Sequence, residues 1–226
     1  RPRREDHIAM NTLMRRSWVL MLIVLVVGCA GAPPPPDWQL NAQGAIERAQ
    51  EAYLSGSSRI EAVEFARVRA EIARTGRAEL VRCATRVASL DFAPCAGFDA
   101  LARDAAAPEQ AYARYLQAQA TAQDAALLPQ QHRPMVAPQS GGAALASIAE
   151  PLSRLVAAGV LMRSGRSDPP TIAQAIDTAS GQGWRRPLLA WLGVQAARAE
   201  LAGDADALAR IRRRIGLVDG EGLTAP

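Results

Sequence analysis

The stretch WLGVQAARAELAGDADALARIRRRIGLV, from Trp191 to Val218, decides the fold class of this chain. Its apolar residues recur at intervals of three and four on both sides of Gly203-Asp204, which is the spacing of helices that bury one face. Gly203-Asp204 is typical of a tight turn. The stretch therefore predicts two helices that pack against each other as an antiparallel hairpin.

Helical spacing extends over the rest of the chain, and no segment alternates long enough to predict a strand. We expect helices from Leu40 to Leu54 and from Ser58 to about Thr75, with Ser58 and Glu61 as a capping box. Asp168, followed by Pro169, is expected to cap the N-terminus of another helix. The remaining predicted helices cover 78–90, 98–106, 108–128, 143–165 and the pair around Gly203. The expected fold is all-α, built from antiparallel helical hairpins.

Two of these hairpins resemble tetratricopeptide-type helical pairs. Between Ala45 and Ile72 the sequence reads AxxAYLxG and then AxxFA, and between Trp191 and Ile215 it reads WLG and then a small-residue turn. The resemblance covers about 55 residues. It implies a tetratricopeptide-like arrangement, or an irregular α-solenoid or bundle.

The N-terminal region carries a targeting pattern. Arg15 and Arg16 precede an apolar run from Trp18 to Val27, and Gly28 and Cys29 follow it. This run is shorter than the roughly 20 residues that a membrane-spanning helix needs. Val26-Val27-Gly28-Cys29 resembles the lipobox of bacterial lipoproteins, which implies cleavage before Cys29, a covalent lipid (palmitate) on Cys29 and, with Ala30 next, transport to the outer membrane.

Five segments are expected along the chain. Residues 1–28 are expected to be a signal peptide whose true start is Met10 or Met14; with Met14 as the start, residues 1–13 belong to a start assigned too early. Residues 29–39 hold the lipidated cysteine and a proline-rich tether, because four consecutive prolines favour an extended backbone. A helical half at 40–128 and a second at 143–220 flank a loop or hinge at 129–142, where three prolines interrupt the helical pattern.

Charge excludes a nucleic-acid-binding surface. The chain has 26 arginines, no lysine and 22 acidic residues, but the leader holds five of the arginines and two of the acids. The part after residue 28 therefore has 21 arginines against 20 acids, a net charge of +1. The basic character belongs to the leader, and the lack of lysine also excludes Schiff-base chemistry.

Two cysteines remain after Cys29 is assigned to the lipid. Cys83 and Cys95 lie 12 residues apart, and in an oxidising envelope such a pair favours a disulfide. A pair of free buried thiols is the alternative.

Catalytic and metal-binding residues are few. His132 is the one histidine after the leader, and its irregular loop is a place where catalytic residues concentrate, although a loop histidine is more often simply solvated. We therefore expect no metal site, no cofactor and no catalytic set. Arg210, Arg213 and Arg214 form a basic group on the last helix that could meet anionic headgroups or an acidic partner, with a solvated helix end as the alternative.

These features predict a lipid-anchored envelope lipoprotein, on the outer membrane and facing the periplasm, that acts without catalysis as a helical scaffold for a protein partner. The alternative is a periplasmic enzyme or ligand carrier that uses the loop near His132.

Overall fold

The computed structural model describes residues 37–71 and 76–220, and these residues form helices and turns without a β-strand. The all-α fold class is confirmed. The first helices are α2 (Asp37–Leu54), α3 (Ser58–Glu71), α4 (Gly76–Ala88), α5 (Ala96–Asp99) and α6 (Ala107–Leu116). They are followed by the 3₁₀ helices η2 (Ala125–Leu127) and η3 (Gln130–Val136), and then by α7 (Gly142–Ala146), α8 (Pro151–Arg163), α9 (Pro169–Gly181), α10 (Arg185–Leu201) and α11 (Ala205–Asp219).

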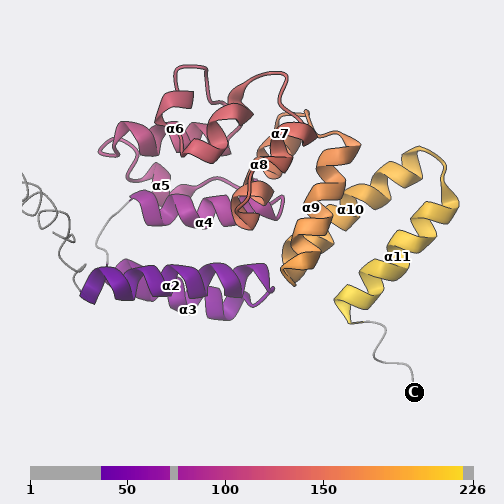
Figure 1. Ribbon diagram of the computed structural model, residues 1–226. Helices are drawn as coiled ribbons and strands as arrows, with labels where there is room; N and C mark the ends of the chain where they lie inside the picture. The colour runs from indigo at the N-terminus through magenta and orange to yellow at the C-terminus, as the bar shows by residue number, and fades with distance from the viewer. Residues whose placement is uncertain (1–36, 72–75, 221–226) are drawn as a thin grey trace, which may run out of the picture. The chain divides into compact units, whose positions relative to one another are not determined.

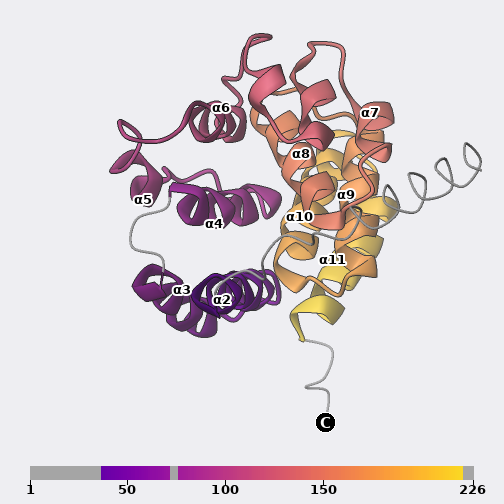
Figure 2. The same cartoon turned by 60° about the vertical axis from the view of Figure 1, so that its left-hand side comes forward.

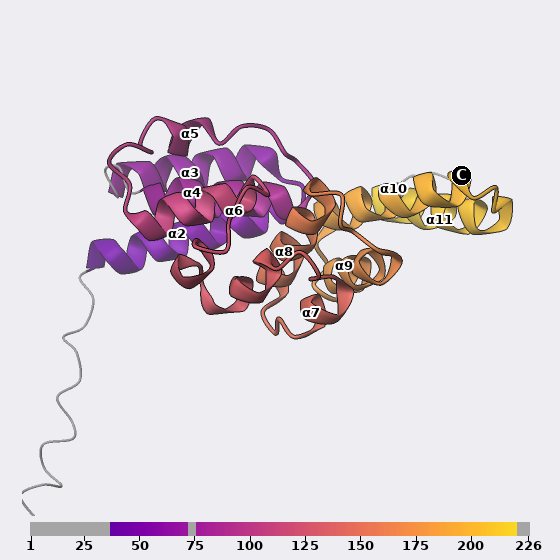
Figure 3. The same ribbon diagram turned by 90° about the horizontal axis from the view of Figure 1, so that it is seen from above.

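Two helical hairpins begin and end the described chain. α2 and α3 lie side by side, as do α10 and α11 (Figure 1). Between these pairs, α4 packs against α6 and α8, while α9 packs against α8 and α10 (Figure 2). Seen from above, α10 and α11 extend beyond α8 and α9 (Figure 3).

The main core forms around α8, which packs against α4 and α9, and Trp191 of α10 reaches into it. Trp191 is fully buried there, and its indole Nε1 donates a hydrogen bond to the Ala88 carbonyl oxygen at 3.1 Å. α8 approaches α4 closely because Gly159 has no side chain: a Cβ built on Gly159 would overlap the Val87 carbonyl oxygen. A second, smaller cluster centres on Val68 and belongs mainly to the α2–α3 hairpin.

Arginine side chains join the α2–α3 hairpin to the rest of the molecule. The Arg186 guanidinium donates from Nε to the Tyr53 carbonyl oxygen and from Nη2 to Ser58 Oγ, each at 2.7 Å, and lies 4.3 Å from the Tyr53 ring centroid. Arg82 donates to Glu61 at 2.8 Å. Polar contacts therefore contribute to this attachment.

Acidic residues begin three helices. The Asp168 carboxylate accepts from the Thr171 amide at 2.8 Å, which confirms the cap predicted for α9. Asp204 accepts from the Ala207 amide at 2.8 Å, after Gly203 has reversed the chain with a φ of +69°. Glu150 caps α8 in the same way.

The helix predicted over 108–128 is wrong in its length, because α6 ends at Leu116. Ala118 adopts a left-handed φ of +59°, which turns the chain away from the helix axis. The Asp124 carboxylate then accepts from the Thr121 amide at 2.8 Å and forms an ion pair with Arg114. Arg114 and Asp124 were both expected within one helix, but their ion pair stabilises a turn.

Three further predictions also need correction. Ser58 and Glu61 do not form the expected capping box, since their side chains bind Arg186 and Arg82. The helix expected over 98–106 is the short α5. The loop expected at 129–142 contains the 3₁₀ helix η3, whereas the helices expected between 143 and 165 are present as α7 and α8.

The predictions for the leader, for Cys29 and for the Pro33–Pro36 part of the tether concern residues outside the described ones. Within residues 37–71 and 76–220, no helix is long and apolar enough to cross a membrane.

Candidate functional site

A buried aromatic cluster surrounds His132. The His132 ring is 1% exposed, and its Nδ1 lies 3.1 Å from the Tyr115 hydroxyl oxygen. The ring centroids of His132 and Tyr115 are 4.9 Å apart, and Tyr112 completes the cluster at 5.7 Å from His132. η3 turns the predicted loop inward, so His132 packs in the core and does not lie on the surface.

Burial keeps this cluster neutral. It lowers the pKa of His132 to about 4, although the nearby Glu150 carboxylate acts in the opposite direction. Burial also raises the pKa of the Tyr112 and Tyr115 hydroxyls. At neutral pH the three groups therefore form an uncharged hydrogen-bonded and stacked unit that positions η3 against α6.

An open groove of about 550 Å³ is lined in part by Tyr112. α4 and α6 form its two walls, and the segment from η2 to Pro129 closes one end. Its apolar lining includes Leu80, Val81, Leu127 and Leu128, while Arg77 and Glu109 supply one charge of each sign. His132 lies behind Tyr112 and does not line this groove.

The groove is suited to binding an apolar side chain that reaches it from outside. Leu127 lines it, and its side chain is 40% exposed. The rim residues Arg77 and Glu109 could fix the direction of a bound segment by hydrogen bonds or ion pairs. The arrangement therefore favours recognition of a partner.

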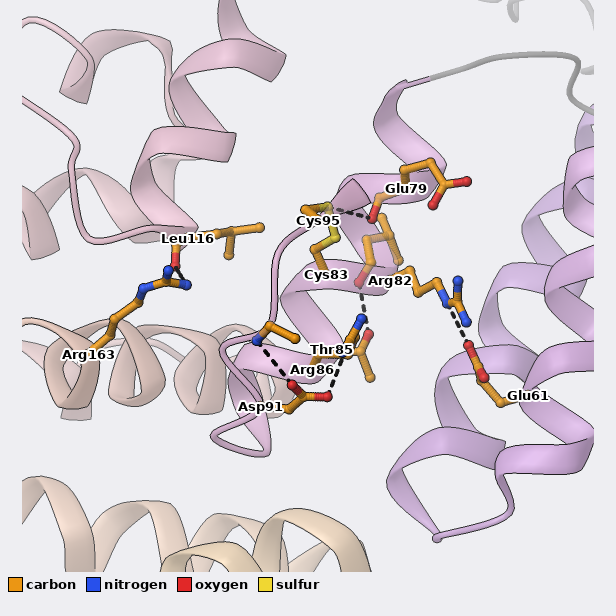
Figure 4. Close-up of a disulfide and its surroundings, with 12 residues drawn as sticks. Glu61, Glu79, Arg82, Cys83, Thr85, Arg86, Asp91, Cys95, Leu116 and Arg163 are labelled. Atoms are coloured by element: carbon orange, nitrogen blue, oxygen red, sulfur yellow. Dashed lines mark hydrogen bonds and ion pairs between the residues drawn. A yellow bond between two sulfur atoms is a disulfide. The ribbon is translucent and has the colours of Figure 1, made fainter. Parts of the chain in front are cut away.

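A smaller cavity of about 200 Å³ lies beside the Cys83–Cys95 disulfide, and Figure 4 shows that disulfide with its surroundings. The disulfide is confirmed, and the two Cα atoms are 5.8 Å apart. It connects α4 to the loop that precedes α5. Across the cavity, Arg163 donates from Nη1 to the Leu116 carbonyl oxygen at 3.4 Å, and its guanidinium lies 5.5 Å from the Phe92 ring centroid.

The structure places Arg210, Arg213 and Arg214 together on α11, as the sequence predicts. Arg210 and Arg213 are exposed, while Arg214 is partly buried and donates to Ser180 Oγ on α9 at 3.3 Å. His132 is not part of this basic group. Among the described residues, no group of three or more histidine, cysteine, aspartate or glutamate side chains is placed to hold a metal ion.

The groove does not follow from the sequence pattern. The expected helix over 108–128 would have placed Leu127 far along its axis from Tyr112. The early end of α6 at Leu116 brings Leu127 back beside Tyr112. The prolines at 129 and 134 were the one visible indication that the chain turns in this region.

No protein-family model matches the chain, and neither the curated proteins nor the solved structures include a significant match to it.

Proposed function

We propose that this chain is a lipid-anchored lipoprotein of the bacterial outer membrane that faces the periplasm and acts as a helical scaffold for a protein partner. The groove between α4 and α6 is the observation that supports this function best. It is open, it has largely apolar walls, and it has a partly exposed leucine at its edge.

The dimensions and lining of the groove suit a segment of a partner protein. A helix or an extended peptide can insert one or two apolar side chains between α4 and α6, while Arg77 and Glu109 contact its polar groups. Binding between helices is also how tetratricopeptide-like proteins hold their partners. The tetratricopeptide-like or solenoid arrangement of the hairpins remains part of this proposal.

A periplasmic enzyme or ligand carrier that uses the 129–142 segment is the alternative. It would require η3 to move, because His132 is 1% exposed and its Nδ1 lies within hydrogen-bond distance of Tyr115. The open groove needs no such movement, and for that reason we favour the scaffold.

The lipid anchor is tested by metabolic labelling with radiolabelled palmitate. We expect the full chain to incorporate the label and a Cys29→Ala variant to lose it. Equal incorporation by both forms would contradict the anchor.

The scaffold is tested by cross-linking in cells, followed by purification and mass spectrometry. A Cys29→Ser form, which is secreted without lipid, is the control. A small, reproducible set of envelope proteins bound to the anchored form alone is expected. Repeated absence of any enriched protein would favour the ligand carrier and make His132 the next residue to vary.

A further inference from the structure

Helix α11 lies at the surface along its whole length, and none of its residues is fully buried. Leu208, Ile211, Ile215 and Val218 are partly buried and share the face that packs toward α10 and the core. The opposite face is therefore free to contact something outside the molecule.

That outer face combines arginines with one large apolar side chain. Arg210, Arg213 and Leu217 are exposed and lie at helical spacings of three and four, so they project from the same side. Leu217 is 73% exposed. Arg214 lies at the edge of this set, and we call Arg210, Arg213, Arg214 and Leu217 the α11 basic face.

The charge of this face is not neutralised within the described part of the molecule. α11 contains four arginines and two aspartates. Arg210 and Arg213 form no ion pair with any described residue, whereas Arg212 approaches Glu200 at 3.6 Å. Asp219, at the far end of the helix, is bound by Arg185 at 2.6 Å and so does not compensate Arg213.

The face has a fixed position. Arg185 donates from Nε to the Val218 carbonyl oxygen at 3.0 Å, and Arg214 donates to Ser180 Oγ. Gly220 ends the helix with a φ of +87°. α11 is thus held at both ends of its C-terminal half, so its outer side chains do not have to be ordered when they bind.

We propose that the α11 basic face binds the anionic headgroups of the bilayer that carries the lipid anchor. This inference rests on the proposed function, because the lipid on Cys29 keeps the protein at that bilayer. Charge complementarity is the argument: unpaired arginines attract anionic lipids, and an exposed leucine among them can enter the headgroup region. The proposed lipid on Cys29 would hold the whole protein at the bilayer and so raise the local concentration of headgroups available to it.

The test measures where Leu217 lies when the full-length lipidated protein is reconstituted into vesicles. A Leu217→Cys variant offers one reactive thiol, because Cys83 and Cys95 form a disulfide and Cys29 carries the lipid. A polarity-sensitive fluorophore on this thiol is compared in phosphatidylcholine vesicles with and without phosphatidylglycerol. The matched label is on Leu201→Cys, a 90% exposed leucine of the same hairpin outside the basic face.

We expect the Leu217 label to shift to an apolar environment on the anionic vesicles, and the Leu201 label to stay in water. Raising the salt to about 1 M should reverse the shift, because the Debye length then falls to about 3 Å. When Arg210→Gln and Arg213→Gln are introduced into the labelled Leu217→Cys protein, the ratio of membrane-bound to unbound α11 should fall about fivefold for each arginine removed. Arg59→Gln/Arg103→Gln, which removes the same charge from exposed positions on other segments, should leave this ratio unchanged.

A Leu217 label that stays in water on protein that floats with both kinds of vesicle would overturn the proposal and leave the anchor intact. So would an equal shift of both labels. A label that responds to polyglutamate but not to anionic vesicles would assign the face to an acidic protein instead. Failure of the protein to float with either vesicle would contradict both the anchor and this proposal.

Discussion

His132 contributes to stability because it is buried without a charge. An unfolded imidazole has a pKa near 6.5, whereas burial lowers the folded value to about 4. As the pH falls, His132 therefore takes up a proton in the unfolded state before it does so in the folded state. The stabilisation present above pH 6.5 is lost as the pH falls from the unfolded pKa to the folded pKa. The loss amounts to about 3 kcal/mol when the pH is near 4.

A His132→Gln variant tests this effect, since glutamine keeps an acceptor for Tyr115 but does not titrate. We expect urea unfolding to show a smaller loss of stability from about pH 7 to about pH 4 in the variant than in the unmodified chain. Carboxylates titrate in both proteins, so only the difference between the two is diagnostic. Equal pH dependence would show that His132 is not buried as described.

Gly159 and Gly193 form a matched pair of helical glycines. A methyl group on Gly159 would overlap the Val87 carbonyl oxygen, whereas nothing lies within 4 Å of the corresponding position on Gly193. Gly159→Ala should therefore lower the free energy of unfolding by about 1–3 kcal/mol through overpacking. Gly193→Ala should raise it by up to about 1 kcal/mol, because alanine is the better helix former.

Thermal unfolding of both variants decides this prediction. A neutral or stabilising Gly159→Ala would mean that α4 and α8 are not in close contact.

At the scale of elements, the disulfide closes a short loop between α4 and the segment before α5. Such a bridge stabilises a protein by about 3 kcal/mol in the chain-entropy model. A Cys83→Ala/Cys95→Ala variant should lose about this amount in urea unfolding, and dithiothreitol should lower the stability of the unmodified chain to a similar level. Thiol counting on the denatured, unreduced protein should find neither of these two cysteines free.

Arg186 attaches the α2–α3 hairpin, while its neighbour Arg185 binds the end of α11. Arg186→Gln should lower the local opening free energy of α2–α3 by about 1.5–3 kcal/mol, the usual worth of hydrogen bonds to a charged group. Hydrogen exchange read by mass spectrometry should then be faster than in the unmodified chain at residues 43–68, and more so than at residues 155–163.

Arg185→Gln is the control for that measurement and should affect α11 instead. If both variants accelerated exchange in the same segments, the two arginines would not have separate roles.

The sequence predicted the element types well and their lengths less well. Apolar spacing was sufficient for α2, α10 and α11, because each buries one face against a close neighbour. It failed for 108–128, where Ala-rich spacing is compatible with a helix but the Arg114–Asp124 pair and the left-handed Ala118 produce a turn. The capping box failed because Ser58 and Glu61 bind arginines that are distant in the sequence, which no local pattern reveals.

The candidate site was harder to predict than the fold. Tyr112, Leu80 and Leu127 form the groove only after α6 has ended early and η3 has folded inward. The arginines of α11 were recognisable because they lie within two turns of one helix. Sites within one element can thus be read from spacing, whereas this groove depends on tertiary packing.

At the scale of the whole molecule, the proposed lipid on Cys29 and the α11 basic face would both contact the same bilayer, and the α4–α6 groove would remain available to a partner. Anchoring raises the local concentration of headgroups near α11 and of a membrane-bound partner near the groove. Each of these two contacts can therefore be weak by itself. Removing the lipid should therefore weaken partner capture more than any single change in the groove.

The proposal that the α4–α6 groove binds a partner is tested by site-specific photo-cross-linking in cells. A photoreactive phenylalanine analogue at position 127, in the groove, is compared with the same analogue at position 60, where Ile60 is 54% exposed on α3. We predict a discrete cross-linked protein from position 127 that is absent from position 60 and diminished by Cys29→Ser. Identical products from both positions, or none from position 127 in the anchored protein, would contradict the claim.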